Sequence, residues 1–198
     1  FRTCRAIILP STIIKKTSLK MSSLRTLVGL IDRYTERCGS LLAWLCLAMT
    51  LVTCAVVLLR YGFSIGSVAS QESVTYMHAC LFMLAAAFTL KRGGHVRVDI
   101  FYRTYSARTK AWVDALGTII FLLPFCIFII GSSWQFVSDA WAIREGSAEP
   151  GGIPAIYLLK TLIPLLAFNL ALQGLAELLR NALFLVDDGA AQKSGDPA

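Results

Sequence analysis

Charged residues are scarce in this chain. Only 16% of its 198 residues are Asp, Glu, Lys or Arg, 56% are hydrophobic, and the mean hydropathy is +0.65. Apolar stretches recur at about the ~20 residues that a helix needs to cross a bilayer. A soluble domain could not bury so much apolar surface, so the composition predicts an integral membrane protein.

Motifs of catalytic and metal sites are also missing. The sequence has no phosphate loop of the Walker type, no GxSxG elbow and no HExxH helix. The cysteines include no CxxC pair and lie mostly in apolar runs, so neither a disulfide framework nor a zinc site is expected. They are Cys4, Cys38, Cys46, Cys54, Cys80 and Cys126. We therefore predict that the chain is not an enzyme.

Histidine is represented only by His78 and His95. Paired axial histidines can hold a heme in a membrane four-helix bundle. His78 falls in the outer half of the second apolar block and His95 in the connector after it, about 25 Å away if that separation is helical. The pair does not suit a heme, and we expect no cofactor and no metal. His78 is interpreted as a packed or hydrogen-bonded residue.

The apolar blocks predict an all-α fold, an integral membrane four-helix bundle. The expected spans are residues 41–59, 72–90, 113–138 and 154–179, within a membrane domain over residues 41–182. Ser106 is expected to cap the helix that leads into the third span. Pro124 should kink that span because proline lacks a backbone N–H, and Pro164 should bend the fourth.

Both ends of the chain are expected to lie outside the spans. Residues 21–40 repeat apolar side chains at helical intervals, which predicts an N-terminal amphipathic interfacial helix, with a solvated linker as the alternative. Residues 1–20 are interpreted as an upstream extension or disordered arm before a start at Met21, because their apolar run is too short for a signal peptide. Residues 183–198 are expected to form a disordered cytoplasmic tail.

Basic residues are distributed unevenly between the two sides. The arm before residue 38 has eight Lys and Arg and the 91–112 connector has six, whereas the 60–72 and 139–154 loops have one each. By the positive-inside rule, the arm and the connector lie in the cytoplasm, and four spans return the C-terminus there. The net charge of +7 thus reports topology rather than nucleic-acid binding.

Ionisable side chains near the spans lie close to their ends, from which they can reach the interface. They are Glu72, Asp114, Lys160 and Glu177. This placement argues against an ion pathway or catalytic site in the chain, because working groups are usually found deep in the bilayer.

A polar stripe marks the fourth span. Asn169, Gln173 and Glu177 recur at four-residue intervals on one helix face, and Gly174 allows close approach beside them. Amides in hydrocarbon need partners, so the stripe predicts contact within the bundle or with another subunit. A substrate-binding stripe is the alternative, but no charge for an anionic solute lies at the midplane.

Several of these features together resemble the small permease subunit, or DctQ family, of TRAP (tripartite ATP-independent periplasmic) transporters. The segment from Gly94 and His95 to Arg97 and Asp99 is similar to the signature of that family. The similarity extends over residues 25–182 and includes Arg60-Tyr61, Glu72, Asp114, Gly152-Ile153-Pro154, Lys160, Leu172-Gln173-Gly174 and Glu177.

The resemblance implies a scaffold subunit in the bacterial inner membrane. In this family the small subunit binds a large multispanning permease that carries the sodium and substrate sites, and a periplasmic binding protein delivers an organic acid. The expected partner contacts are Arg60, Glu72, Lys160, the stripe, and the segment from Gly94 to Asp99. A local ion pair between Arg97 and Asp99 is the alternative there.

Two further alternatives remain open. Arg144, Glu145 and Glu149 in the outer loop would touch the binding protein or simply be solvated. A self-sufficient homo-oligomeric channel or carrier is the competing function, and it predicts activity without a partner.

Overall fold

The computed structural model describes residues 11–95 and 102–194, with side chains for residues 21–95 and 102–187. All regular structure in that part of the chain is helical, which confirms the predicted all-α class. The elements are α1 (Ser11–Gly62), α2 (Val68–Lys91), α4 (Ala107–Gly117), the π-helical turn η1 (Thr118–Leu122), α5 (Leu123–Ala142) and α6 (Ile156–Ser194).

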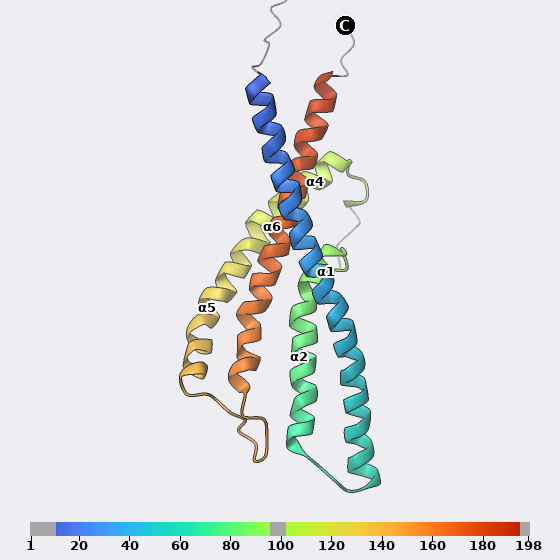
Figure 1. The fold of residues 1–198 in the computed structure, drawn as a ribbon, viewed down its shortest axis with the longest axis vertical. Helices are drawn as coiled ribbons and strands as arrows, with labels where there is room; N and C mark the ends of the chain where they lie inside the picture. The colour runs from blue at the N-terminus through green and yellow to red at the C-terminus, as the bar shows by residue number, and fades with distance from the viewer. Residues whose placement is uncertain (1–10, 96–101, 195–198) are drawn as a thin grey trace, which may run out of the picture.

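Among the described residues, four helical segments are long and apolar enough to cross a membrane: Met21–Gly62, Val68–Lys91, Ala107–Ala142 and Ile156–Asp187. They run up and down, so that the start of α1 and the end of α6 project from the same end of the bundle (Figure 1). We call this the terminal end, and we call the opposite end, which holds the 63–67 and 143–155 loops, the loop end.

The first helix is longer than the sequence predicts. Residues 11–20, expected as an extension or disordered arm, and residues 21–40, expected as a separate interfacial helix, continue into the first span as one helix of 52 residues. The apolar side of residues 21–40 packs on α6, where Val28 and Ile31 form a buried cluster with Ala176. A helix-to-helix contact therefore takes the place expected for lipid.

The second helix has clear stop signals at both ends. Ser67 precedes it, and its hydroxyl oxygen accepts a hydrogen bond from the backbone N–H of Ser70. Beyond Lys91 the chain turns at Gly93, whose φ of +62° lies in the left-handed region that glycine tolerates. The cation and glycine signals of the sequence thus predict this helix end correctly.

The third span is interrupted in the region where Pro124 predicts a disturbance. Ser106 caps α4 as predicted, accepting from the backbone N–H of Thr109. The π-helical turn η1 follows α4, and Pro124 stands in the first turn of α5. In a regular α-helix the proline ring would clash with a carbonyl of the preceding turn, and that carbonyl would lack a donor. A wider turn before the proline accommodates both effects.

The fourth span occupies the centre of the bundle. Helix α6 contacts α1, α2, α4 and α5, and its most apolar window is 39% buried within the chain, against 6–11% for the other three. It contains Pro164 and extends through residues 183–194, which were expected as a disordered tail. That stretch has no proline, and its alanines favour helix.

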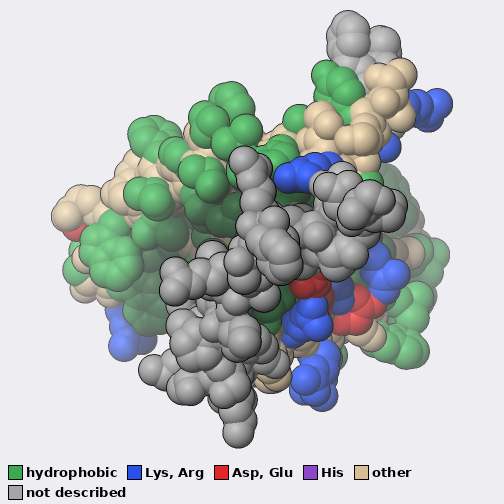
Figure 2. Space-filling model, turned by 90° about the horizontal axis from the view of Figure 1, so that it is seen from above, with side chains coloured by type: hydrophobic (Ala, Val, Ile, Leu, Met, Phe, Trp, Pro, Cys, Tyr) green, Lys and Arg blue, Asp and Glu red, His purple; other side chains and the backbone are tan. Residues whose placement is uncertain are grey.

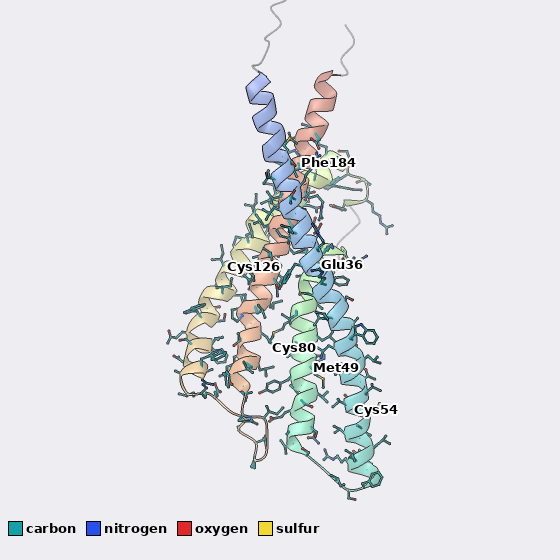
Figure 3. All side chains as sticks on the ribbon, viewed as in Figure 1. Glu36, Met49, Cys54, Cys80, Cys126 and Phe184 are labelled. Carbon is teal, nitrogen blue, oxygen red and sulfur yellow. The ribbon has the colours of Figure 1, made fainter. Side chains whose placement is uncertain are left out.

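Small residues allow these helices to approach one another. Cys126 of α5 is fully buried with Ala167 and Leu170 of α6, and Figure 3 shows it between the two helices. A Cβ added to Gly174 would collide with Leu122 of η1, and one added to Gly39 would collide with the ring of Phe88. Glycine at these two positions therefore permits the contacts of α6 with η1 and of α1 with α2.

Candidate functional site

Charged side chains and one buried amide, from α1, α6 and the end of α2, meet near the terminal end of the bundle. We call this group the terminal-end cluster: Asp32 and Glu36 of α1, Lys91 of α2 with Arg92 just after it, and Gln173, Glu177 and Arg180 of α6. Figure 2 shows acidic and basic side chains gathered at this end of the molecule. The cluster lies where the predicted charge bias places the cytoplasmic surface.

Arg180 holds α1 and α6 together in this cluster. Its guanidinium reaches Oδ2 of Asp32 at 2.7 Å and Oε1 of Glu177 at 2.6 Å. One cation on α6 thus neutralises a carboxylate on its own helix and another on α1. The arrangement is a helix clamp, because each charged atom has a partner of opposite sign.

Glu36 joins α1 to the end of α2. The ammonium of Lys91 lies 2.7 Å from Oε2 of Glu36 and donates a second hydrogen bond, at 2.8 Å, to the backbone carbonyl of Asp32. Arg92 pairs with the other carboxylate oxygen of Glu36. Figure 3 shows Glu36 at the level where α2 ends. The cations that mark a span end in the sequence therefore also tie two helices together.

The predicted polar stripe of α6 faces α1. The phenol of Tyr34 donates to Oδ1 of Asn169 at 3.0 Å, and the hydroxyl of Thr35 donates to Oε1 of Gln173 at 2.8 Å. Gln173 also donates a longer hydrogen bond, at 3.4 Å, to Oδ1 of Asp32. Asn169 is 6% exposed and Gln173 is 0% exposed, so both amides are used inside this chain.

A second group of contacts fixes the loop end. One oxygen of the Glu72 carboxylate accepts from the hydroxyl of Ser147, and the other accepts from the backbone N–H of Ile153 at 2.6 Å. A Cβ on Gly152 would come within 2.7 Å of Oε1 of Glu72. The start of α2 therefore anchors the 143–155 loop, and glycine at 152 makes the approach possible.

Lys160 supports the same loop from α6. Its ammonium lies 2.5 Å from Oε2 of Glu145 and 4.0 Å from the ring centre of Phe136 on α5. Nearby, the indole N–H of Trp141 donates to the hydroxyl of Thr161 at 2.8 Å. Glu72 and Lys160, two predicted contact residues, thus organise this end within the chain.

A cavity of about 460 Å³ opens between α2, α4, η1 and α6. Lys91, Asp114, Glu177 and Arg180 contribute its charged lining. Asp114 accepts a hydrogen bond from the phenol of Tyr102 at 2.7 Å. The cavity borders the terminal-end cluster, and its charges already have partners in the chain.

Other predicted residues lie apart from both groups. Arg60, Gly94 and His95 are exposed, and Arg97 and Asp99 lie outside the described residues. His78, expected to be packed or hydrogen-bonded, is exposed, and within the described part of the chain it only stacks on Phe82, with ring centres 6.4 Å apart. Among the side chains that the structure describes, no group of three His, Cys, Asp or Glu residues could hold a metal ion.

Sequence reasoning missed the α1 half of the terminal-end cluster. Asp32, Thr35 and Glu36 stand three and four residues apart, a spacing that puts them on one helix face. That pattern was the available signal, but an interfacial helix also carries a polar face. Only the contact with α6 across the bundle distinguishes a helix that packs on the bundle from one that lies in the membrane interface.

Comparison with known proteins agrees with this architecture. The chain is 32% identical over 96 residues to the "C4-dicarboxylate TRAP transporter small permease protein DctQ" of Vibrio cholerae serotype O1 (strain ATCC 39315 / El Tor Inaba N16961). That match covers 48% of this chain and 41% of the relative, which is less than half of either. No solved structure matches the chain significantly.

A protein-family match extends further. Residues 49–184, which span all or part of each apolar helix, match the family described as "Tripartite ATP-independent periplasmic transporters, DctQ component". The resemblance stated from the motifs is thereby confirmed. The chain belongs to the DctQ family and is a small membrane subunit of a TRAP transporter.

Proposed function

We propose that this subunit is a scaffold, and that sodium and an organic acid cross the membrane through a larger permease component. One observation carries the proposal. Each half-buried carboxylate among the described side chains has a partner inside the chain: Asp32, Glu36, Glu72, Asp114, Glu145 and Glu177.

A transport pathway needs polar groups that are free to exchange partners with the passing solute. Here the buried amides and the carboxylates already have partners within the chain, most of them between helices or with the 143–155 loop. Gln173 is the clearest case, since it is fully buried and hydrogen-bonded to Thr35 and Asp32 of α1. Such contacts make a rigid body rather than a channel.

The lengths of α1 and α6 also agree with the proposed scaffold role. With a rise of 1.5 Å per residue, the 52 residues of α1 extend about 78 Å and the 39 residues of α6 about 58 Å. The hydrocarbon core of a bilayer is only about 30 Å thick. Both helices therefore project beyond it at the terminal end (Figure 1), where they could brace a moving partner of the elevator type.

The proposal includes a membrane location, an orientation and partners. The basic arm and connector favour a bacterial inner membrane orientation with both termini in the cytoplasm. The partners are the large permease component, a periplasmic substrate-binding protein that meets the loop end, and membrane lipids. The name of the Vibrio relative makes small dicarboxylates the first substrates to test.

The experiment is transport by cells that express the binding protein and the large component with or without this chain. We expect organic acid uptake only when the chain is present, and loss of uptake when potassium replaces sodium. Uptake that is equally fast without the chain would contradict the scaffold role. Uptake that ignores sodium would contradict the coupling.

A further inference from the structure

One exposed face of α2 carries polar side chains, and one of them, His78, lies at a depth where lipid is apolar. Gln71, Thr75, His78 and Phe82 are all exposed and follow one another at four, three and four residues. This spacing puts them in a single stripe along the helix. We call these four residues the His78 face.

His78 lies far from either end of its helix. Helix α2 has 24 residues and is about 36 Å long, and His78 is ten residues beyond Val68, or about 15 Å from the start. This is close to the middle of a span of bilayer length. The imidazole is therefore too deep to reach lipid headgroups from the loop end.

The side chains of this face lack hydrogen bonds within the described part of the chain. His78 has a stacking contact with Phe82, and no side-chain hydrogen bond joins Gln71, Thr75 or His78 to another described residue. Several exposed polar side chains on other spans do form such bonds, although Ser40 on α1 and Ser138 on α5 form none with a described residue. Thr50 and Thr53 donate to carbonyls one turn earlier, Ser132 donates to Ile129, and Gln135 donates to Asp139.

The outer surfaces of α1 and α5 are largely apolar. On α1 the exposed side chains include Leu47, Leu51 and Leu58, and on α5 they include Phe125 and Phe128. An imidazole among acyl chains is disfavoured unless another polar group meets it. The His78 face therefore calls for a protein partner.

We propose that the His78 face docks against the large permease component, and that a transmembrane helix of that component presents a hydrogen-bonding group to His78 at mid-membrane depth. This rests on the proposed function, which supplies the partner. The family is described as one component of a tripartite transporter, and this favours another component over a second copy of this chain as the occupant. Lipid tails offer no hydrogen-bonding group.

The first test is copurification of the co-expressed large component in mild detergent. His78→Leu and Thr75→Val should each weaken the complex by roughly three- to thirtyfold, the range expected for a hydrogen bond between membrane helices. His78→Gln should retain most binding, because its amide can replace the imidazole nitrogen. The matched control is Thr53→Val on α1, which should leave binding unchanged.

A second measurement avoids variants that fail to fold. The photo-crosslinking residue benzoylphenylalanine at position 78 should form an adduct with the large component in whole membranes, and the same residue at position 53 should not. An adduct with a second copy of this chain, or with lipid alone, would overturn the proposal.

The two proposals fail in different ways. If the unaltered chain copurifies with the large component but His78→Leu does so equally well, the docking face is wrong and the scaffold role stands. If the unaltered chain does not bind the large component at all, both proposals are wrong.

Discussion

Thr35 donates its hydroxyl hydrogen to Oε1 of Gln173 at 2.8 Å, although the two residues are 138 positions apart in the sequence. Thr35 is 3% exposed and Gln173 is 0% exposed. The bond links α1 to the centre of α6 beside the Asp32 and Arg180 ion pair. It therefore sets the register between the first and last helices of the bundle.

Replacing the amide should loosen this contact. Gln173→Leu keeps a similar volume but removes the acceptor for Thr35, so we expect a loss of about 1–2 kcal/mol in the free energy of unfolding. Denaturation by sodium dodecyl sulfate in mixed micelles measures this loss.

A double-mutant cycle of Gln173→Leu with Thr35→Val should give a coupling energy of at least about 0.5 kcal/mol. Gln135→Leu, on an exposed position of α5, is the control. Additive single effects would contradict the account.

The guanidinium of Arg180 should matter more than an exposed one. Arg180→Gln leaves the carboxylates of Asp32 and Glu177 without their shared cation, and we expect a loss of about 1–3 kcal/mol in unfolding free energy. Arg25→Gln is the matched control, because the side chains of Arg25 and Asp187 are 61% and 52% exposed and such pairs contribute about 0–1 kcal/mol. Equal losses in the same unfolding assay would argue against the clamp.

The anchored loop should become accessible when Gly152 acquires a side chain. In Gly152→Ala the new methyl group collides with Ser147 and approaches Glu72, so the 143–155 loop must shift. Trypsin cleavage after the exposed Arg144 should be several-fold faster than in the unaltered chain. Gly131→Ala on α5, where a Cβ meets nothing within 4 Å, should cleave at the original rate. Unchanged cleavage of Gly152→Ala would show that the loop does not depend on this approach.

Fusions test the proposed orientation of the chain. Alkaline phosphatase needs its disulfides and therefore the oxidising periplasm. Inserted after Gly66 in the 63–67 loop, it should be active, and fused after residue 198 it should be inactive. A fluorescent protein at the C-terminus should show that the inactive fusion is still made. Activity in the reverse pattern would place the terminal end outside the cytoplasm.

Hydropathy predicts most of the fold because segments that cross the lipid must consist mainly of apolar residues. The four spans, the helix stop at Lys91 and the cap at Ser106 all follow from local signals. The continuity of α1 does not. The pattern of residues 21–40 predicts a separate interfacial helix before the span, yet Gly39 lies within one continuous helix and allows the close approach of α1 to Phe88. A glycine signals either a break or a contact, and the sequence alone does not distinguish them.

The candidate site was predicted in part. The periodicity of Asn169 and Gln173 predicts a polar face that needs a partner, and it leaves open whether that partner is in the chain. The answer depends on how α1 packs on α6, which places Tyr34 and Thr35 opposite the amides. Packing also decides the case of His78. Its neighbours in the sequence are largely apolar, so the sequence predicts a packed residue, whereas the structure leaves its imidazole exposed.

The central claim is that solute passes through a companion of this chain and not through the chain itself. It is tested most directly by reconstituting the purified chain alone into liposomes, imposing an inward sodium gradient, and measuring uptake of a radiolabelled C4-dicarboxylate presented with the binding protein. The account predicts no uptake above empty liposomes, and uptake once the large component is added. Sodium-driven accumulation by the chain alone would contradict it.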